Sequence, residues 1–372
     1  MLNPVQLAEH IVTAATGGDA GALLELLTGL DHDQAINAVT VLEPLVKDQK
    51  AEALVDGALS YLEDLVDKPD DLKPSGFAIP CPSGALAPAA AALWQCVVDR
   101  AEERDDEAVL AMALHNVALE LGEASEYATA VHALQRCVAI RQRLFAQDPD
   151  LHGPRLASSL NNLSYLLRRI GQTRGCMDAI QQAVEIYERL AKRNPGTFEP
   201  YLASSLSNLC VSLGETGQRE AGVDAIGRAV EIYERLAAND PCTYEPNLAM
   251  MLINLSNRLA EVGRSVAGLA AIQRSVEICE RLAQSNPDAH EPGLAVAQNV
   301  LSICLEEMGQ REAGIEALKR CVEIKERLAQ RNPDAYAPSL ARSLIDLAQL
   351  LDDTGDDSGA RAAREKAAKA SH

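Results

Sequence analysis

The 372-residue sequence has few aromatic residues and many fewer basic than acidic ones. Phe, Trp and Tyr make up only 3% of the chain, and 54 Asp and Glu residues against 34 Lys and Arg residues give a formal net charge of −20. Such an excess of negative charge repels phosphate backbones and anionic lipids, and few aromatic rings are available to stack on bases. We therefore expect no nucleic-acid partner and no binding to a membrane surface.

The usual motifs of catalysis and metal binding are also missing. The nine cysteines form no Cys-x-x-Cys pair, and the seven histidines form no His-Glu-x-x-His motif. The segment from Gly217 to Gly222 has spaced glycines but lacks the Lys-Ser/Thr of a phosphate loop. The acidic segment 352–357 has its glycine at the wrong place for a calcium loop. We expect no enzyme, no cofactor and no metal site.

Export and membrane insertion are not indicated either. The N-terminus has no basic segment, and it carries Glu9 and His10 where the apolar core of a signal peptide would run. The uncharged stretch 74–98 contains four prolines, which would break a membrane-spanning helix. An odd number of cysteines does not suggest a disulfide framework. The expected location is cytoplasmic.

A repeat of 46 residues organises most of the chain. It is marked by two series of prolines and one of glycines, namely Pro154, Pro200, Pro246, Pro292 and Pro338; Pro149, Pro195, Pro241, Pro287 and Pro333; and Gly171, Gly217, Gly263, Gly309 and Gly355. In the unit from Pro200 to Asp240, leucines recur at helical spacing up to Leu213. We expect Pro200 to open a first helix, Gly217 to end it, and a second helix to end at Asp240.

The repeat predicts an all-α chain with three regions. These are an acidic N-terminal helical region at 1–66, with helices at about 4–16, 20–29, 33–47 and 50–66; a Pro/Gly-rich linker at 67–88; and a superhelix at 89–372. In the superhelix, a helix at 89–104 precedes repeats that start near 108, 154, 200, 246, 292 and 338. Arg364 stands where earlier units have an apolar residue, so the last helix is expected to be a polar cap.

These units resemble tetratricopeptide repeats. In the third unit the resemblance lies in Leu209, Leu213, Gly222, Ile226 and Ala229, at the family's spacing of large and small packing residues. The period is twelve residues longer than the usual 34, and it is similar to that of the kinesin light chain type and of long-period repeats in actinomycetes and other bacteria. The resemblance covers about residues 108 to 372 and implies a right-handed α-solenoid of antiparallel helix pairs.

In this family the first helix of each pair lines a concave groove that receives a peptide or a partner helix. Asn116, Asn162, Asn208 and Asn254 recur along these helices at the repeat period. Each amide either faces a ligand, as the resemblance implies, or bonds to a neighbouring helix and sets the register. The expected groove residues are Asn116, Asn161, Asn162, Tyr165, Arg168, Arg169, Ser204, Asn208, Asn254, Asn257, Asn299, Glu306 and Arg342.

The resemblance implies a non-enzymatic scaffold or adaptor that binds a partner protein. The expected groove is basic at Arg168 and Arg169 and acidic at Glu306, which favours a partner of basic or mixed charge. Two alternatives remain. The chain is a structural subunit of a fixed complex or homo-oligomer that uses its convex face or N-terminal helices, or it is a signalling regulator whose N-terminal region is the effector. Residues 1–107 hold 20 acidic and 6 basic residues.

Three packing expectations complete the prediction. Trp94 is expected to be a buried anchor. The cysteines in the repeat core, such as Cys137 and Cys210, are expected to be small buried apolar residues without a redox or metal role. On the second helices, Glu residues that precede Arg by four positions, as at 277/281 and 323/327, are expected to pair on an outer, solvated face.

Overall fold

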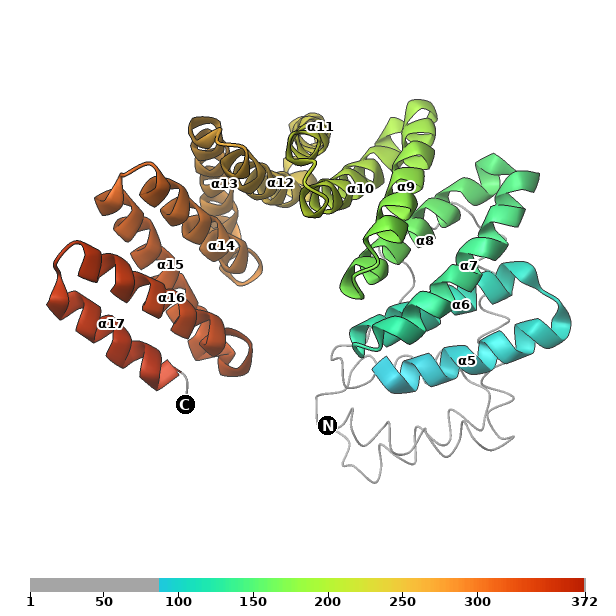
Figure 1. The fold of residues 1–372 in the computed structure, drawn as a ribbon, viewed down its shortest axis with the longest axis horizontal. Helices are drawn as coiled ribbons and strands as arrows, with labels where there is room; N and C mark the ends of the chain where they lie inside the picture. Colours follow the sequence, from blue (N-terminus) through green and yellow to red (C-terminus); the bar gives the residue numbers. More distant parts are fainter. Residues whose placement is uncertain (1–86, 371–372) are drawn as a thin grey trace, which may run out of the picture. The chain divides into compact units, whose positions relative to one another are not determined.

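A computed structural model describes residues 87–370, and all the regular elements in that part of the chain are α-helices (Figure 1). The chain divides into two compact units, residues 1–201 and 202–372, which we call unit 1 and unit 2. Within each unit, consecutive helices pack as antiparallel pairs, which confirms the predicted all-α repeat. The helices predicted within 1–66 and the linker up to residue 86 lie outside the described residues. Residues 87 and 88 were assigned to the linker, and this was wrong because they begin a helix.

Unit 1 contains α5 (Ala87–Arg104), α6 (Glu107–Glu123), α7 (Tyr127–Gln147), α8 (Pro149–Arg169) and α9 (Thr173–Arg193). Each of these helices packs against the next one along the chain. The helix α5 corresponds to the helix predicted at 89–104. Trp94 on this helix is only 5% exposed, so the prediction of a buried anchor is confirmed.

The helix α10 (Pro195–Glu215) contains the boundary between the units. Unit 2 continues with α11 (Arg219–Asn239), α12 (Pro241–Glu261), α13 (Ser265–Ser285), α14 (Pro287–Glu307), α15 (Arg311–Arg331), α16 (Pro333–Asp353) and α17 (Asp357–Ala370). We call α6, α8, α10, α12, α14 and α16 the first helices, and α7, α9, α11, α13, α15 and α17 the second helices. The two first helices α12 and α14 also contact each other directly.

The first helices from α8 onward begin five residues earlier than predicted. Pro195 is the first residue of α10, and Pro200 lies inside that helix, so the prediction that Pro200 opens it was wrong. Asp or Asn before the opening proline caps most of these helices: the Asp240 side chain accepts a hydrogen bond from the backbone N–H of Thr243 at 3.2 Å. A proline at the first position loses no helical hydrogen bond, and a cap before it satisfies a free N–H group.

A glycine ends the first helix of each full repeat, as predicted. Gly217 has a φ of 78°, and the N–H of Gln218 bonds to the carbonyl of Leu213 at 2.8 Å, which closes the helix end. The same turn recurs at the other four glycines of this series. In the first pair this position is held by Ser125, which adopts a φ of 64° without being glycine.

The core repeats with the same period. In the second helices the innermost positions are Ile180, Ile226 and Ile272, each fully buried. Cys137 and Cys210 are also buried, which confirms their predicted packing role. A second glycine of the repeat allows the two helices of a pair to approach closely, because a Cβ on Gly222 would lie 3.3 Å from the carbonyl oxygen of Cys210.

The outer charges are arranged differently from the prediction. Arg281 pairs with Glu245 at 2.7 Å, and Arg327 pairs with Glu291 at the same distance. Each arginine therefore bridges to the preceding first helix instead of the Glu four residues earlier on its own helix, because a long guanidinium side chain reaches an acid across the helix pair. At the C-terminal end, Arg364 on α17 pairs with Asp352 on α16.

Candidate functional site

Exposed apolar side chains gather on the first helices of unit 2. Seven large hydrophobic residues are substantially exposed in the described part of the chain. Four of them lie on first helices of unit 2: Met250 at 60%, Val296 at 50%, Ile303 at 48% and Ile345 at 57% exposure. We call the surface formed by these four side chains and their polar neighbours the first-helix face of unit 2.

The helical period places these residues on one side of each helix. On α14, Val296, Asn299 and Ile303 are spaced by three and four residues, which puts them on a single stripe. On α16, Arg342 and Ile345 occupy the same repeat positions as Val296 and Asn299, and both are exposed. The stripe on α14 therefore has a counterpart at the same repeat positions on α16.

The repeated asparagines are partly buried beside this stripe. Asn254 on α12 donates a hydrogen bond from Nδ2 to Ser207 Oγ on α10 at 3.3 Å, so one amide links two first helices. Asn208, Asn257 and Asn299 are half-buried, and each retains some accessible surface. The hydrogen bond of Asn254 is what the register interpretation expects, and the remaining exposure leaves room for a ligand contact.

Two other predicted residues of unit 2 lie at the surface. Ser204 on α10 and Glu306 on α14 are exposed. The predicted groove includes Ser204 but not Met250 and Val296, which follow it at intervals of 46 residues. The repeat register was therefore the signal that could have found these two apolar residues.

In unit 1 the structure corrects one prediction. Asn116 on α6 is only 3% exposed, and its amide nitrogen has no hydrogen-bond partner among the described residues. A side chain this deeply buried is not presented to a ligand, because neighbouring helices cover it. Asn162 on α8 is half-buried, with Nδ2 3.5 Å from Nε2 of His115. Asn161, also on α8, is half-buried.

Two predicted arginines of unit 1 lie over tyrosine rings. The Arg168 guanidinium lies 5.5 Å from the ring centroid of Tyr165, which is 45% exposed. Arg169 lies 4.7 Å from the ring centroid of Tyr127 and donates to its hydroxyl at 2.7 Å. These contacts hold the arginines against the protein while leaving their charge near the surface.

Residues 87–370 hold neither a metal-binding cluster nor a membrane span. They contain no group of three or more His, Cys, Asp or Glu residues placed to hold a metal ion. None of the described helices is both long and apolar enough to cross a membrane. Burial raises the pKa of the Cys210 thiol to about 11, and it also raises the pKa values of Cys279 and Cys321, which disfavours their reactive thiolate forms.

Comparison with known proteins connects this fold to a family. Models described as tetratricopeptide repeat match residues 110–150, 156–195 and 295–327. A comparison with curated proteins gives no match.

Solved structures with a similar fold are also found. BtubC (BKLC) from P. vanneervenii is 19% identical, with a TM-score of 0.52 over 64% of this chain and 89% of its own. The kinesin light chain TPR-like repeats of Podospora anserina are 20% identical, with a TM-score of 0.47 over 59% of this chain and 95% of theirs. Aspartyl phosphate phosphatase F from Bacillus subtilis is 14% identical, with a TM-score of 0.49 over 100% of this chain and 95% of its own.

At these identities the likeness concerns the fold and carries no partner over to this chain. The family matches agree with the helix pairs seen in the structure and with the glycine turn that recurs between them. The chain is a tetratricopeptide repeat protein.

Proposed function

We propose that this protein is a non-enzymatic interaction scaffold that binds a peptide or a helix of a partner protein on the first-helix face of unit 2. Tetratricopeptide repeat proteins are in general protein-interaction scaffolds. The observation that carries the proposal is the exposure of Met250, Val296, Ile303 and Ile345 on first helices of one unit. Grouped apolar side chains on an otherwise charged surface mark an interaction site.

The spacing of these side chains suits an elongated ligand. Val296 and Ile303 lie two helical turns apart on α14, and Ile345 lies on α16. A partner segment with apolar residues at helical or alternating spacing can cover several of these side chains at once. Burying about 100 Å² of apolar surface contributes on the order of 2.5 kcal/mol before the cost of association, so several contacts are needed for stable binding.

The half-buried amides add polar contacts between the apolar ones. Asn208, Asn257 and Asn299 each carry a donor and an acceptor, so they can pair with the backbone of an extended segment whatever its side chains are. In this proposal they orient the ligand, and Asn254 also joins α12 to α10. The ligand-facing and register roles are thus combined in one row of residues.

The charges near this face favour a partner segment of basic or mixed charge. Glu306 and Asp346 are exposed beside the apolar residues, and Arg342 is an exposed cation on α16. Exposed charges of this kind mainly affect the rate of association and the choice of partner. We expect bound segments to carry Lys or Arg where they approach Glu306 or Asp346 and an acidic residue where they approach Arg342.

A matched pair of substitutions tests the proposal. Val296→Asp places a charge on α14 within the face, while Val266→Asp places the same charge on α13, where Val266 is 73% exposed. Peptides are first selected from a displayed random library on the wild-type protein. Their dissociation constants are then measured by fluorescence anisotropy with both variants, after circular dichroism has shown that each variant is folded.

We expect Val296→Asp to weaken binding at least tenfold and Val266→Asp to change it by less than twofold. Equal effects of the two substitutions would place binding elsewhere, as in a structural subunit that uses its convex face. Selection of no peptide above background would also reject the proposal.

A further inference from the structure

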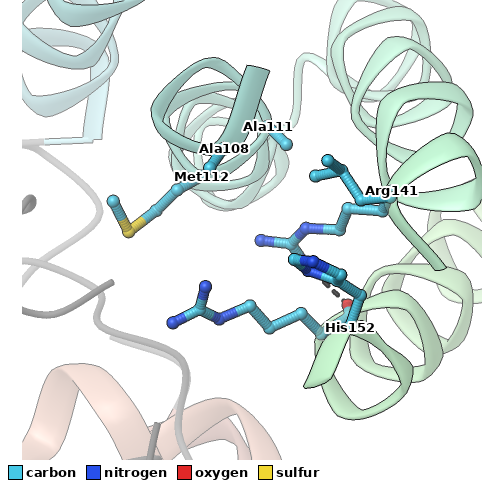
Figure 2. Close-up of a pocket in the computed structure, with 7 residues that line it drawn as sticks. Ala108, Ala111, Met112, Arg141 and His152 are labelled. Carbon is cyan, nitrogen blue, oxygen red and sulfur yellow. Dashed lines mark hydrogen bonds between the residues drawn. The ribbon is translucent and has the colours of Figure 1, made fainter. Parts of the chain in front are cut away.

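A small pocket in unit 1 gathers basic side chains from two helices. It lies between the first helices α6 and α8, with the second helix α7 behind it. Arg141 of α7 and His152 and Arg155 of α8 line one side, and Ala108 and Met112 of α6 line the other. Figure 2 shows Arg141 and His152 across the pocket from Ala108, Ala111 and Met112.

Arg141 is a buried cation without an acidic partner among residues 87–370. It is 7% exposed, and its Nη1 donates to the carbonyl oxygen of Arg155 at 2.7 Å and to the hydroxyl of Ser159. Both acceptors are neutral, and Arg141 forms no ion pair with any described residue. A buried charge that is not neutralised locally is costly, so a site that holds one is prepared to bind an anion.

Four described carboxylates near the pocket have partners outside it. Asp106 caps α6, Asp148 caps α8, Glu107 pairs with Arg143, and Asp150 pairs with Arg193. The pKa of Arg155 is lowered mainly by burial and also by the nearby charge of Arg141. The pKa of His152 is lowered mainly by burial and also by the charge of Arg155, while the charge of Asp148 raises it.

The same position in the next repeat is filled differently. One period after Arg141, His152 and Arg155 the sequence has Tyr187, Phe198 and Tyr201. The rings of Tyr187 and Tyr201 stack with centroids 5.7 Å apart, and Phe198 packs beside Tyr201 at 6.4 Å. The basic set in unit 1 is therefore not required for a helix pair of this length to pack.

Part of the role of Arg141 is structural. In unit 2, Lys325 occupies its repeat position and donates to the carbonyl oxygen of Ser339 at 3.3 Å and to Ser343 Oγ at 2.8 Å, the same two kinds of acceptor. In the same repeat as Lys325, Tyr336 occupies the position that corresponds to His152. The pocket of unit 1 thus differs in having the His152 imidazole and the Arg155 guanidinium beside the buried cation Arg141.

We propose that this pocket binds a single oxyanion group, a carboxylate or a phosphate. Guanidinium groups donate paired hydrogen bonds to both, and the imidazole adds a further donor. The group is supplied either by a small free anion or by an acidic residue of a bound peptide that crosses α6 and α8. The site lies in unit 1, so it is independent of the first-helix face of unit 2.

The test uses the full chain and follows the His152 imidazole resonances by NMR at low ionic strength, assigned with a His152→Phe variant. The probes are inorganic phosphate and the blocked tripeptides Ac-Gly-Asp-Gly-NH2 and Ac-Gly-Asn-Gly-NH2. Arg155→Gln removes one pocket charge. Arg136→Gln removes an exposed charge from α7 that pairs with Glu102, and it serves as the control.

We expect a saturable shift of the His152 resonance that Arg155→Gln weakens at least fivefold and Arg136→Gln changes by less than twofold. A response to phosphate alone identifies a free-anion site. A response to the aspartate tripeptide and not to the asparagine one identifies a peptide-borne carboxylate. The proposal is overturned if no probe gives a saturable shift in the wild type, or if both arginine variants weaken binding equally.

Discussion

Gly217 and Gly227 give opposite predictions for the same substitution to alanine. Gly217 lies in the turn between α10 and α11 with a φ of 78°, and Gly227 lies within α11. A Cβ placed on either residue meets no other atom within 4 Å. The two variants therefore differ in the backbone conformation that alanine must adopt and not in packing.

The expected magnitudes follow from that conformation. Alanine in the left-handed region costs about 1–2 kcal/mol, and the smaller freedom of its unfolded chain offsets about 0.4–1 kcal/mol of this. Gly217→Ala should thus lower the free energy of unfolding by about 1 kcal/mol. Gly227→Ala should raise it by about 0.5–1 kcal/mol, because alanine is favoured over glycine inside a helix.

Urea titration followed by far-ultraviolet circular dichroism measures both changes against the wild type. The slope of each transition should be compared as well, because a repeat protein can unfold in parts and the midpoint alone then misstates stability. Shifts of the two midpoints in the same direction would refute the reasoning from backbone conformation.

Three further predictions concern single residues. Ser125→Gly should raise the free energy of unfolding by about 1 kcal/mol in urea titration, because Ser125 has a φ of 64° where later repeats have glycine. Gln298→Leu should raise the free energy of unfolding by about 1 kcal/mol, followed as a rise in the thermal midpoint. Gln298 is 1% exposed and its Oε1 has no hydrogen-bond partner among the described residues, and relief of this unpaired oxygen outweighs loss of the 3.5 Å hydrogen bond from its Nε2 to Glu280; an unchanged or lower midpoint would contradict this. Burial and the charge of Arg141 hold the pKa of His115 well below 6.5, so below that pH the unfolded chain takes up a proton that the folded chain does not. Stability should fall on acidification by at most about 1.4 kcal/mol per pH unit from this group, and His115→Asn should remove that part of the loss in urea titrations between pH 8 and 5.

The helix pairs and their turns could be predicted because their causes are local. A glycine such as Gly217 recurs where the chain must adopt a positive φ, and leucines at helical spacing mark the buried side of a helix. The start of the first helices was missed for an equally local reason. Pro195 and Pro200 are both compatible with a helical φ, and the prediction chose the second although Asn194 precedes the first.

The site was only partly predictable. The repeat period placed Ser204 and Asn299 on the accessible side of the first helices, and it could have placed Met250 there as well. It could not show that Asn116 is buried while Asn162 retains exposure, since the two share one repeat position and differ in the helices packed over them. The ion pairs could not be predicted for the same reason. Glu277 precedes Arg281 by four residues on the same helix, but the packing of the helices pairs Arg281 with Glu245 on the preceding helix.

Periodicity in the sequence was thus enough to indicate the family, the pairing of helices and the glycine turn within each repeat, because these depend on residues close together in the chain. The burial of Asn116 and the basic pocket of unit 1 became recognisable only with the packing of separate helices. Arg141, His152 and Arg155 lie on two helices, and nothing in their spacing shows that they line one pocket with Met112 of a third. Burial and charge at a site depend on which helices cover it, and that is a property of the folded chain.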